Sequence, residues 1–148
     1  AIARGVRLDV GHGSASFSFA VAKQAIGLGI LPQTISSDIY CRNRINGPVY
    51  SLAKVMSKFL AIGMSLPQVI ACVTDHAADG LRLSQKGRLA PGFDADLTIF
   101  DLRSQPVLFR DAENDSLQAN QLLTPLAAIR AGKGYMTEQG SAEHAFDL

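Results

Sequence analysis

The sequence contains no tryptophan and only two cysteines, Cys41 and Cys72, among 148 residues. The two thiols lack the CxxC spacing of a zinc or redox motif, and two cysteines in a chain of this length do not indicate a disulfide scaffold. The expected compartment is therefore the reducing cytoplasm. Cys72 falls on an apolar helix face, so we expect it in the core.

An excess of charge of one sign is also absent, since 14 basic residues face 13 acidic ones and no basic run occurs. The sequence therefore predicts neither a nucleic-acid groove nor a basic membrane-binding face. No apolar run has the length of a membrane span, and the opening residues AIARGVRLDV lack the features of a secretory signal peptide. The first residue is not methionine, which leads us to expect a further part of the protein upstream.

What the sequence does contain is a large apolar fraction, 47% of the residues, which is enough for a globular core. Up to about residue 85, short apolar runs alternate with segments in which apolar residues recur at helical spacing. The expected order is a strand at 6–10 that ends in Gly-His-Gly, a helix at 17–28, a strand at 30–37, a polar loop at 38–48, a helix at 50–62 and a helix that begins around Pro67.

Residues 86–148 differ in character, because turn residues and short apolar runs replace the helical pattern. We expect strands at 96–101, 105–111 and 126–137, the last broken by a Gly-Lys-Gly turn at 132–134. Two strand–helix units cannot close an eight-stranded parallel barrel. The predicted fold class is therefore α/β: residues 1–85 form the end of a TIM-like (β/α)8 barrel, and residues 86–148 form the strands of a small β module and a tail.

Asp38 follows the second expected strand, in the sequence TISSDIY. Residues just after the strands of a barrel lie at its C-terminal mouth, where barrel enzymes place their chemistry. A carboxylate there needs a metal, a cation or hydrogen bonds to offset its desolvation, and beside a metal-activated water it can also accept a proton. The alternative is structural, because Asp38 could cap a turn through its own side chain.

His12 follows the first expected strand and lies between two glycines, which should leave its imidazole little shielded. It could donate a hydrogen bond, bind a metal or carry a proton, or it could be a loop histidine whose glycines meet unusual backbone angles. Arg42, Asn43 and Arg44 could anchor an anionic substrate, because arginine binds carboxylates through two parallel hydrogen bonds, or they could form a solvated loop.

The remaining candidates carry weaker signals. His76 is expected near a helix C-terminus, where the helix dipole favours a cation and the role is structural. His144 lies in a polar tail and is expected to be inert. Cys41 is close to Asp38 in the sequence, but no adjacent base marks it as a nucleophile.

Four stretches resemble the amidohydrolase superfamily. GRLAPGFDADLTIFD at 87–101 closely resembles the segment that precedes the return of the chain to a small β-sandwich. VTDHAADGLRL resembles the helix and turn before it, except that the family commonly has proline in place of Ala77. TISSDIY resembles the last barrel strand, and DVGHGSASF resembles strand seven of the dihydroorotase-like and deacetylase subgroup. The resemblance extends to about residue 137.

This resemblance implies the last two strand–helix units of the family's barrel, followed by strands of a β-sandwich that N-terminal strands complete. It also implies that Asp38 is a metal ligand and the general base, and that His12 faces the substrate. Tyr40 and Arg42 are then further candidate substrate contacts. Asp94 and Asp96 would be structural, because they would hold backbone groups of a turn.

The superfamily's other metal-binding groups, including a His-x-His pair on strand one, lie upstream of strand seven and are not in this sequence. A chain with one clear ligand should neither hold zinc tightly nor turn over substrate alone. The implied parent enzyme uses one or two zinc ions to hydrolyse a C–N bond in a small cyclic amide or N-acyl substrate. The alternatives are a deaminase of the same superfamily and a non-catalytic relative that serves as an assembly subunit. Open barrel and sheet edges lead us to expect that the chain alone self-associates or misfolds.

Overall fold

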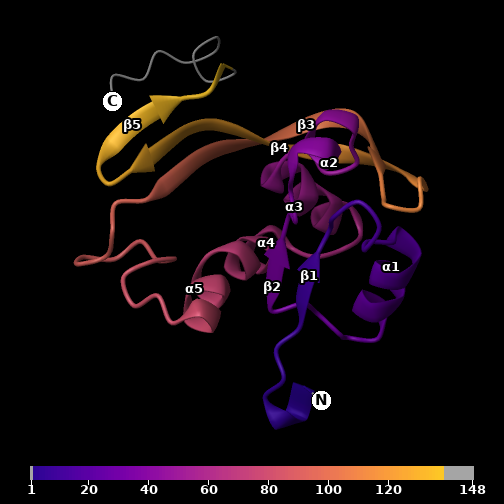
Figure 1. Cartoon of the computed structure of the whole chain (residues 1–148), viewed down its shortest axis with the longest axis horizontal. Coiled ribbons are helices and arrows are strands. Elements are labelled where there is room, and N and C mark those ends of the chain that lie inside the picture. The colour runs from indigo at the N-terminus through magenta and orange to yellow at the C-terminus, as the bar shows by residue number, and fades with distance from the viewer. Residues whose placement is uncertain (1, 139–148) are drawn as a thin grey trace.

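The computed structural model describes residues 2–138, which form an α/β structure with two separate sheets (Figure 1). The α/β class expected from the sequence is confirmed. The elements are the 3₁₀ helix η1 (Ile2–Arg4), β1 (Asp9–Gly11), α1 (Phe19–Gly27), β2 (Thr34–Ser36), α2 (Cys41–Asn46), α3 (Leu52–Ala61), α4 (Leu66–Val73), α5 (Asp75–Leu81), β3 (Leu97–Arg110), β4 (Ser116–Arg130) and β5 (Lys133–Met136).

The strands β1 and β2 form a short parallel pair, and α1 makes the crossover between them. The hydroxyls of Thr34 and Ser36 donate to the two carboxylate oxygens of Asp9, at 2.6 and 3.2 Å. Both strands are shorter than the ranges 6–10 and 30–37 expected from the sequence. The reason is that a strand extends only as far as its hydrogen-bonding partner, and in the part of the chain that the structure describes these two strands pair only with each other.

The helices α3 and α4 begin where local capping residues place them. Ser51 accepts a hydrogen bond from a backbone N–H in the first turn of α3, and Ser65 and Gln68 form a capping box at the start of α4. The helices expected at 50–62 and around Pro67 are confirmed. Among residues 2–138, no helix combines the length and the apolar character that crossing a membrane requires.

The polar loop expected at 38–48 instead contains the helix α2. Asn43 holds its start, because its side-chain oxygen accepts from the N–H of Tyr40 and its amide donates to the C=O of Asp38, both at 2.9 Å. Asn43 is fully buried. It therefore serves the backbone of this turn and is not available to anchor an anionic substrate.

The strands expected at 96–101 and 105–111 are one strand, β3, which pairs with β4 in a long antiparallel hairpin. The register of this pair shifts at two irregularities, and Pro106 and Pro125 lie at one each. Proline cannot donate to the ladder and is tolerated at such bulges. The break expected between residues 101 and 105 is therefore wrong, because the strand continues through a bulge there.

The strand β4 begins ten residues earlier than the strand expected at 126–137. The expected break is present, although the turn to β5 lies at Ala131 and Gly132 instead of at 132–134. Gly132 has a φ of +77°, which explains why glycine stands at this turn.

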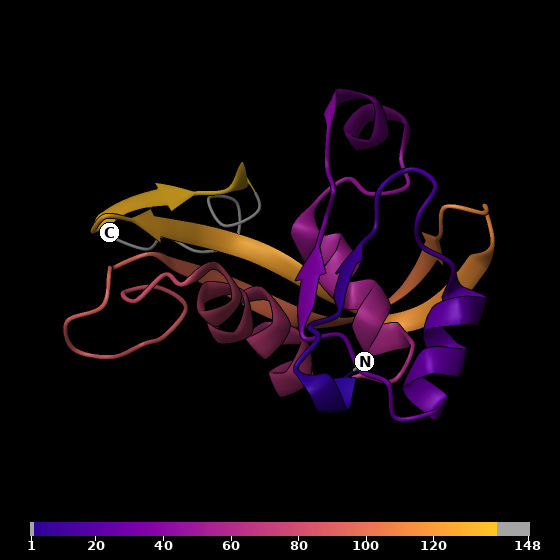
Figure 2. The same cartoon turned by 60° about the horizontal axis from the view of Figure 1, so that its bottom comes forward.

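The helix α3 lies between the parallel pair and the long hairpin (Figure 2). All three contribute to one apolar core. Its buried members include Val55 and Phe59 on α3, and Phe109 and Leu123 on the hairpin. The hydroxyl of Ser57 on α3 accepts a buried hydrogen bond of 2.9 Å from the N–H of Leu123. The core thus spans the boundary between residues 85 and 86, and the division of the chain there stays a prediction.

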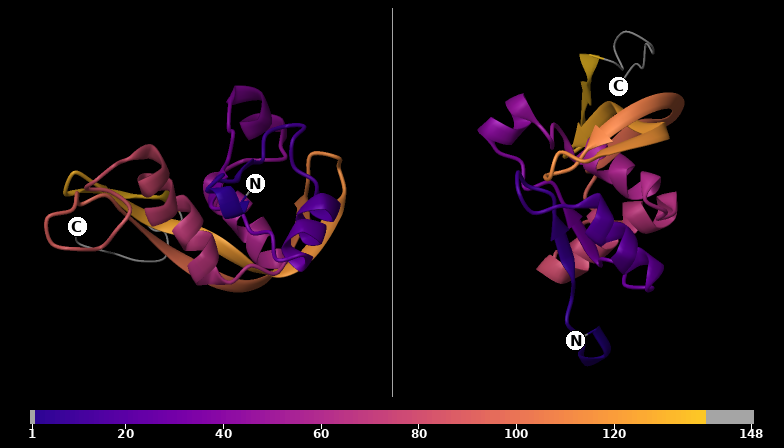
Figure 3. Two further views of the ribbon diagram at one scale, coloured as in Figure 1. Left: turned by 90° about the horizontal axis from the view of Figure 1, so that it is seen from below. Right: turned by 90° about the vertical axis from the view of Figure 1, so that its right-hand side faces the viewer.

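The hairpin curves past α3 and its tip reaches α1 (Figure 3). The N–H of Ala112 donates to the C=O of Phe17 at 3.0 Å, and the carboxylate of Asp111 accepts from the N–H of Phe19 at 2.8 Å. The C-terminal hairpin therefore fixes the segment that leads from β1 into α1.

Candidate functional site

The loops that follow β1 and β2 meet at the carboxyl ends of the two parallel strands. The N–H of Gly13 donates to the C=O of Ser37 at 3.2 Å, and the hydroxyls of Ser14 and Tyr40 lie 2.9 Å apart. The structure therefore places the loop after β1 beside the loop after β2, where Asp38 lies. In a parallel α/β structure this is the edge at which active sites form.

Asp38 has a φ of +48°, in the left-handed region that residues with a Cβ seldom adopt. Its side chain is exposed, and within residues 2–138 no group donates a hydrogen bond to its carboxylate. The carboxylate packs against Gly13, where an added Cβ would lie only 2.5 Å from Asp38 Oδ2. The side-chain cap that would explain Asp38 structurally is thus not formed, whereas strained backbone is typical of functional sites. The catalytic and metal-binding roles of Asp38 stay predictions.

Tyr40 and Arg42 flank the start of α2 next to Asp38. The side chain of Tyr40 is 48% exposed, and Arg42 and the neighbouring Cys41 are also exposed. All three side chains are therefore accessible from solvent. The roles of Tyr40 and Arg42 as substrate contacts stay predictions.

The expectation that the flanking glycines leave His12 little shielded is wrong. Its side chain is fully buried and stacks on Phe17, with 4.6 Å between the ring centroids. Nδ1 lies 3.0 Å from the C=O of Gly13, and Nε2 lies 2.8 Å from Nζ of Lys58. Burial lowers the pKa of His12, and the Lys58 ammonium acts in the same direction, so the neutral imidazole is favoured.

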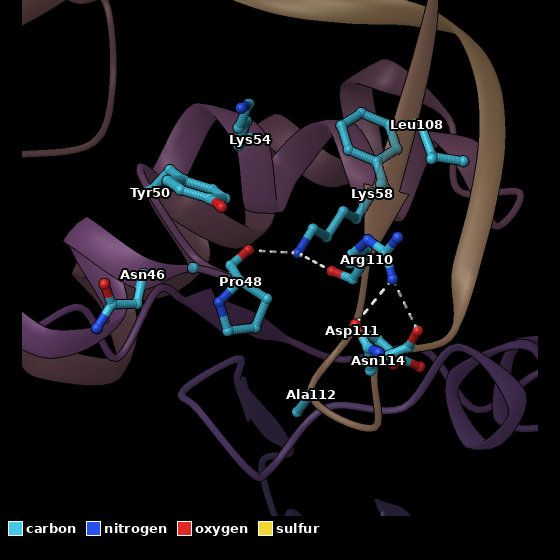
Figure 4. Close-up of a pocket in the computed structure, with 12 residues that line it drawn as sticks. Asn46, Pro48, Tyr50, Lys54, Lys58, Leu108, Arg110, Asp111, Ala112 and Asn114 are labelled. Carbon is cyan, nitrogen blue, oxygen red and sulfur yellow. Dashed lines mark hydrogen bonds between the residues drawn. The ribbon is translucent and has the colours of Figure 1, made fainter.

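The partner of His12 is Lys58, a lysine on α3 that is only 1% exposed. Its ammonium also contacts the C=O of Pro48 at 2.8 Å and the C=O of Arg110 at 2.6 Å (Figure 4). Burial lowers the pKa of Lys58 to about 8, although the nearby Asp111 carboxylate acts in the opposite direction. Lys58 therefore joins the loop after β1, the segment before α3 and the end of β3.

Asp111, at the hairpin tip, is 2% exposed and uses both carboxylate oxygens. It accepts the N–H of Phe19 at 2.8 Å, of Glu113 at 3.0 Å and of Asp115 at 2.9 Å. Asp111, Glu113 and Asp115 lie close enough to share a cation. Because backbone hydrogen bonds already occupy the Asp111 oxygens, the turn itself accounts for this cluster.

A pocket of about 400 Å³ lies between α2, α3 and the hairpin tip (Figure 4). The polar side chains that line it largely contact one another. Nζ of Lys54 lies 4.5 Å from the ring centroid of Tyr50, and Arg110 donates to Oδ1 of Asn114 at 2.8 Å. Asp38 does not line this pocket, so the pocket is separate from the edge at which Asp38 lies.

Lys58 and Asp111 were both missed in the sequence. A signal for Lys58 was present, because it lies three residues after Val55 and four before Ile62, on the apolar face of α3. Asp111 stands in the run DAENDS, which is typical of a turn. Nothing in that run shows that its first carboxylate turns inward.

Two weaker candidates are accounted for structurally. Cys72 is 2% exposed and its thiol donates to the C=O of Pro32 at 3.2 Å, which confirms its place in the core. His76 lies at the start of α5 and not at a helix C-terminus, and its Nδ1 is 3.2 Å from the C=O of Gln33. The prediction for His144 falls outside the described residues.

The prediction that the carboxylates of Asp94 and Asp96 hold turn backbone groups is confirmed for Asp96, whereas Asp94 pairs with a side chain. Both carboxylates pair with the ammonium of Lys86 in the exposed turn before β3. Asp96 also accepts the N–H of Ala131 at 2.9 Å, which ties this turn to the one between β4 and β5. These carboxylates hold the turn and are not an acid–base pair.

A metal ion at the carboxyl edge of the parallel pair would find one clear ligand among the described residues, the carboxylate of Asp38. Nε2 of His12 faces the Lys58 ammonium, and His76 faces a backbone C=O. A zinc site normally takes three or four protein ligands. The residues present therefore fit a part of such a site and do not complete it.

Comparison with known proteins adds a consistent result. Residues 18–132 match the model of the amidohydrolase family. The chain is 42% identical over 132 residues to a deacetylase of Enterococcus faecalis, in an alignment that covers 89% of this chain and 36% of the relative.

Two solved structures have the same fold over this region. The crystal structure of an adenine deaminase superimposes with a TM-score of 0.90 at 40% sequence identity, and the match covers 92% of this chain and 37% of the deaminase chain. The crystal structure of a dihydroorotase superimposes with a TM-score of 0.83 at 39% sequence identity, and the match covers 89% of this chain and 35% of the dihydroorotase chain. The chain thus spans about a third of the length of the relatives that it matches.

Proposed function

Because this chain belongs to the amidohydrolase family, we propose that it is the C-terminal third of a metal-dependent amidohydrolase. In this proposal β1, α1, β2 and the helices that follow are the last two units of a (β/α)8 barrel, and β3–β5 belong to a small β-sandwich that other strands complete. The length of the relatives supports it, since each is almost three times as long as the segment matched. The chain by itself is then inactive.

The proposed reaction is hydrolysis of a C–N bond in a small cyclic amide or N-acyl substrate. Relatives described as a deacetylase and a dihydroorotase support this class. The observation that carries the proposal is the free, exposed carboxylate of Asp38, held in a left-handed turn at the carboxyl edge of the parallel strands. Such a carboxylate can bind a metal and can also accept a proton.

In the complete enzyme, Asp38 accepts a proton from the attacking water and passes it to the leaving nitrogen. One or two zinc ions, held by Asp38 together with ligands from other parts of the enzyme, would polarise the scissile carbonyl and lower the pKa of the attacking water. Gly13 and Asn43 keep the carboxylate in place from two sides, through packing and through the Asp38 backbone.

Tyr40 and Arg42 are the proposed substrate contacts, because they are exposed beside Asp38. The Ser14 hydroxyl bonds to the Tyr40 hydroxyl and so fixes the phenol at the same edge. His12 would contact a substrate only if its ring left the Lys58 ammonium, because in the present geometry its side chain is buried against Lys58 and Gly13.

A second candidate is a deaminase, in which the leaving nitrogen is an exocyclic amine. The similarity to the adenine deaminase structure supports it. The same residues would act in the same roles, so the two candidates differ only in the substrate. A panel that contains cyclic amides, N-acyl compounds and aminopurines separates them.

The decisive experiment is the substitution Asp38→Asn in the complete protein that contains this chain. Asparagine keeps the size of the side chain but cannot accept the proton, and loss of a general base typically costs about 10²- to 10⁴-fold in rate. We therefore expect kcat to fall by that order, while the thermal midpoint changes little because the carboxylate is exposed. Asp79→Asn, which removes an exposed carboxylate on α5, is the matched control. Near-normal turnover of Asp38→Asn would rule out the proposed role.

A further inference from the structure

The buried ammonium of Lys58 has three N–H donors, and the structure supplies three acceptors. Two are carbonyl oxygens, of Pro48 and Arg110, and the third is Nε2 of His12. These acceptors come from three different segments that are far apart in the sequence. An ammonium with three fixed acceptors cannot rotate freely, so it holds these segments in one arrangement.

These contacts also determine the tautomer of His12. The C=O of Gly13 can only accept, so Nδ1, which lies 3.0 Å from it, must carry the ring proton. The Lys58 ammonium can only donate, so Nε2 must offer its lone pair. Stacking on Phe17 fixes the plane of the ring. His12 is thus a neutral imidazole that passes the orientation of Lys58 on to the backbone of Gly13.

Gly13 in turn lies directly against Asp38. Its Cα faces the carboxylate so closely that an added Cβ would be 2.5 Å from Oδ2, and its N–H donates to the C=O of Ser37. A shift of the Gly13 backbone by a fraction of an ångström would therefore either press on the Asp38 carboxylate or open a gap beside it. Among the described residues, no group donates a hydrogen bond to the Asp38 carboxylate, so packing against Gly13 is what positions it.

We propose that Lys58 is a positioning residue for Asp38, which acts through the Nδ1–H tautomer of His12 and the backbone of Gly13. The contacts run without a break from the ammonium to the imidazole, from the imidazole to the Gly13 carbonyl, and from Gly13 to the carboxylate. The catalytic part of this inference rests on the proposed function of Asp38. Its structural part, the tautomer, does not.

The alternative is that Lys58 only stabilises the fold. Burial of an ammonium costs several kcal/mol that an apolar side chain of similar size would not. Unlike such a side chain, a lysine holds three acceptors in fixed positions at once. A purely structural lysine would leave the geometry at Asp38, and therefore kcat, unaffected by its removal, provided that the protein stays folded. The effect on kcat in a folded variant therefore separates the alternatives.

The first test is the ¹⁵N NMR spectrum of the complete protein, labelled at histidine, with His12→Gln used to assign the signals of His12. We expect a protonated Nδ1 and an unprotonated Nε2 at neutral pH. A protonated Nε2 would overturn the proposal, because the Lys58 ammonium could not then donate to it. This result does not depend on any activity, so it stands even if the proposed reaction is wrong.

The second test measures kcat and KM of Lys58→Met on the substrate that the panel identifies. We expect kcat to fall about 10- to 100-fold with little change in KM, because misplacement of a reacting group by about 1 Å can cost about 10²-fold. In the same variant the Nε2 signal of His12 should shift, because the Lys58 ammonium no longer donates to it, while the Gly13 carbonyl still holds the proton on Nδ1. Lys54→Met, one turn earlier on α3, is the matched control and should keep both kcat and the Nε2 signal. Unchanged kcat in folded Lys58→Met would overturn the proposal.

His12→Gln covers the case in which Lys58→Met does not fold. Glutamine can accept from the Lys58 ammonium through its side-chain oxygen. It lacks the second ring nitrogen of histidine, which donates to the Gly13 carbonyl. We expect a folded protein with a lowered kcat and an unchanged KM. A raised KM with unchanged kcat would instead identify His12 as a substrate contact and overturn the proposal that Lys58 positions Asp38 through His12. If Asp38→Asn is fully active, the proposed function fails while the tautomer measurement still decides the structural part.

Discussion

Asp38 and Lys58 both contact the loop after β1, Asp38 at Gly13 and Lys58 at His12, but they differ in exposure and in hydrogen bonding. The carboxylate of Asp38 is exposed and accepts no hydrogen bond from the described residues. The ammonium of Lys58 is 1% exposed and all three of its donors are used. His12 lies between them and belongs to the buried side, because it is fully covered and both ring nitrogens are engaged.

This difference separates residues that hold the site from residues that can act in it. A buried charge is tolerated only when its partners are in place, so the cluster of Lys58, His12 and Asp111 is a fixed support. A carboxylate without partners keeps its capacity to bind a metal or take up a proton. The exposed residues beside it, Tyr40 and Arg42, share that availability.

The largest effect on stability is expected from Lys58→Met. The substitution fills the same space but leaves the carbonyls of Pro48 and Arg110 and Nε2 of His12 without their donor. Each unpaired buried group costs about 1–3 kcal/mol, so we expect a loss of about 3 kcal/mol in the free energy of unfolding of the complete protein. Denaturant unfolding measures it, with Lys54→Met as the control. A loss no greater than that of the control would show that the buried cluster is not a support.

The stabilities of the wild type and of Lys58→Met should respond differently to pH. Burial lowers the pKa of Lys58 to about 8 from 10.5 in the unfolded chain, against the opposing effect of Asp111 and with the help of the Lys54 ammonium. Between these two values the unfolded chain binds the proton that the folded chain has released, so the contribution of Lys58 to stability rises with pH. Below pH 8 both states carry the proton and the contribution is flat. The difference in stability between wild type and Lys58→Met should therefore grow from about pH 8 to 10, and a constant difference would contradict the lowered pKa.

Gly13→Ala tests the exposed part of the site, because it should displace the Asp38 carboxylate. The new Cβ would meet Asp38 Oδ2 at 2.5 Å, and the φ of +54° is unfavourable for alanine. We expect kcat of the complete protein to fall about 100-fold, because the carboxylate must move. Gly29→Ala is the matched control, since Gly29 has a φ of +74° but nothing within 4 Å of an added Cβ. It carries the same kind of backbone strain, and equal losses of activity in the two variants would show that strain and not contact with Asp38 is responsible.

The sequence predicted those parts of the fold that depend on local signals. The helices α3 and α4 begin at Ser51 and Ser65, which cap their own first turns, and both were found. The strands were less predictable because their ends depend on partners. The break expected between the strands at 96–101 and 105–111 is absent, because pairing across the hairpin continues through the bulges at which Pro106 and Pro125 lie.

The candidate site was predictable to a similar degree. Asp38 was found because its position after a strand is a property of the sequence, and the structure places it at the expected edge. Its neighbour Gly13, which packs on the carboxylate, and the shielding of His12 depend on how three distant segments meet. Lys58 stands on an apolar helix face, where a lysine more often extends its ammonium into solvent. Only the packing of the hairpin against α3 shows that this one does not.

The smallest effect is expected from Asp111→Asn, which weakens the buried cluster without removing its central lysine. Each carboxylate oxygen of Asp111 accepts backbone N–H groups, so the amide of asparagine would set a donor against a donor. We expect a loss of about 1–2 kcal/mol in the free energy of unfolding, against less than about 0.5 kcal/mol for Glu113→Gln, a nearby exposed control. The Asp111 carboxylate also raises the pKa of Lys58, so its removal should move the pH-dependent rise in stability to lower pH. Were the rise to stay in place, Asp111 would act only through the turn, and the support of Asp38 would rest on Lys58 and His12 without it.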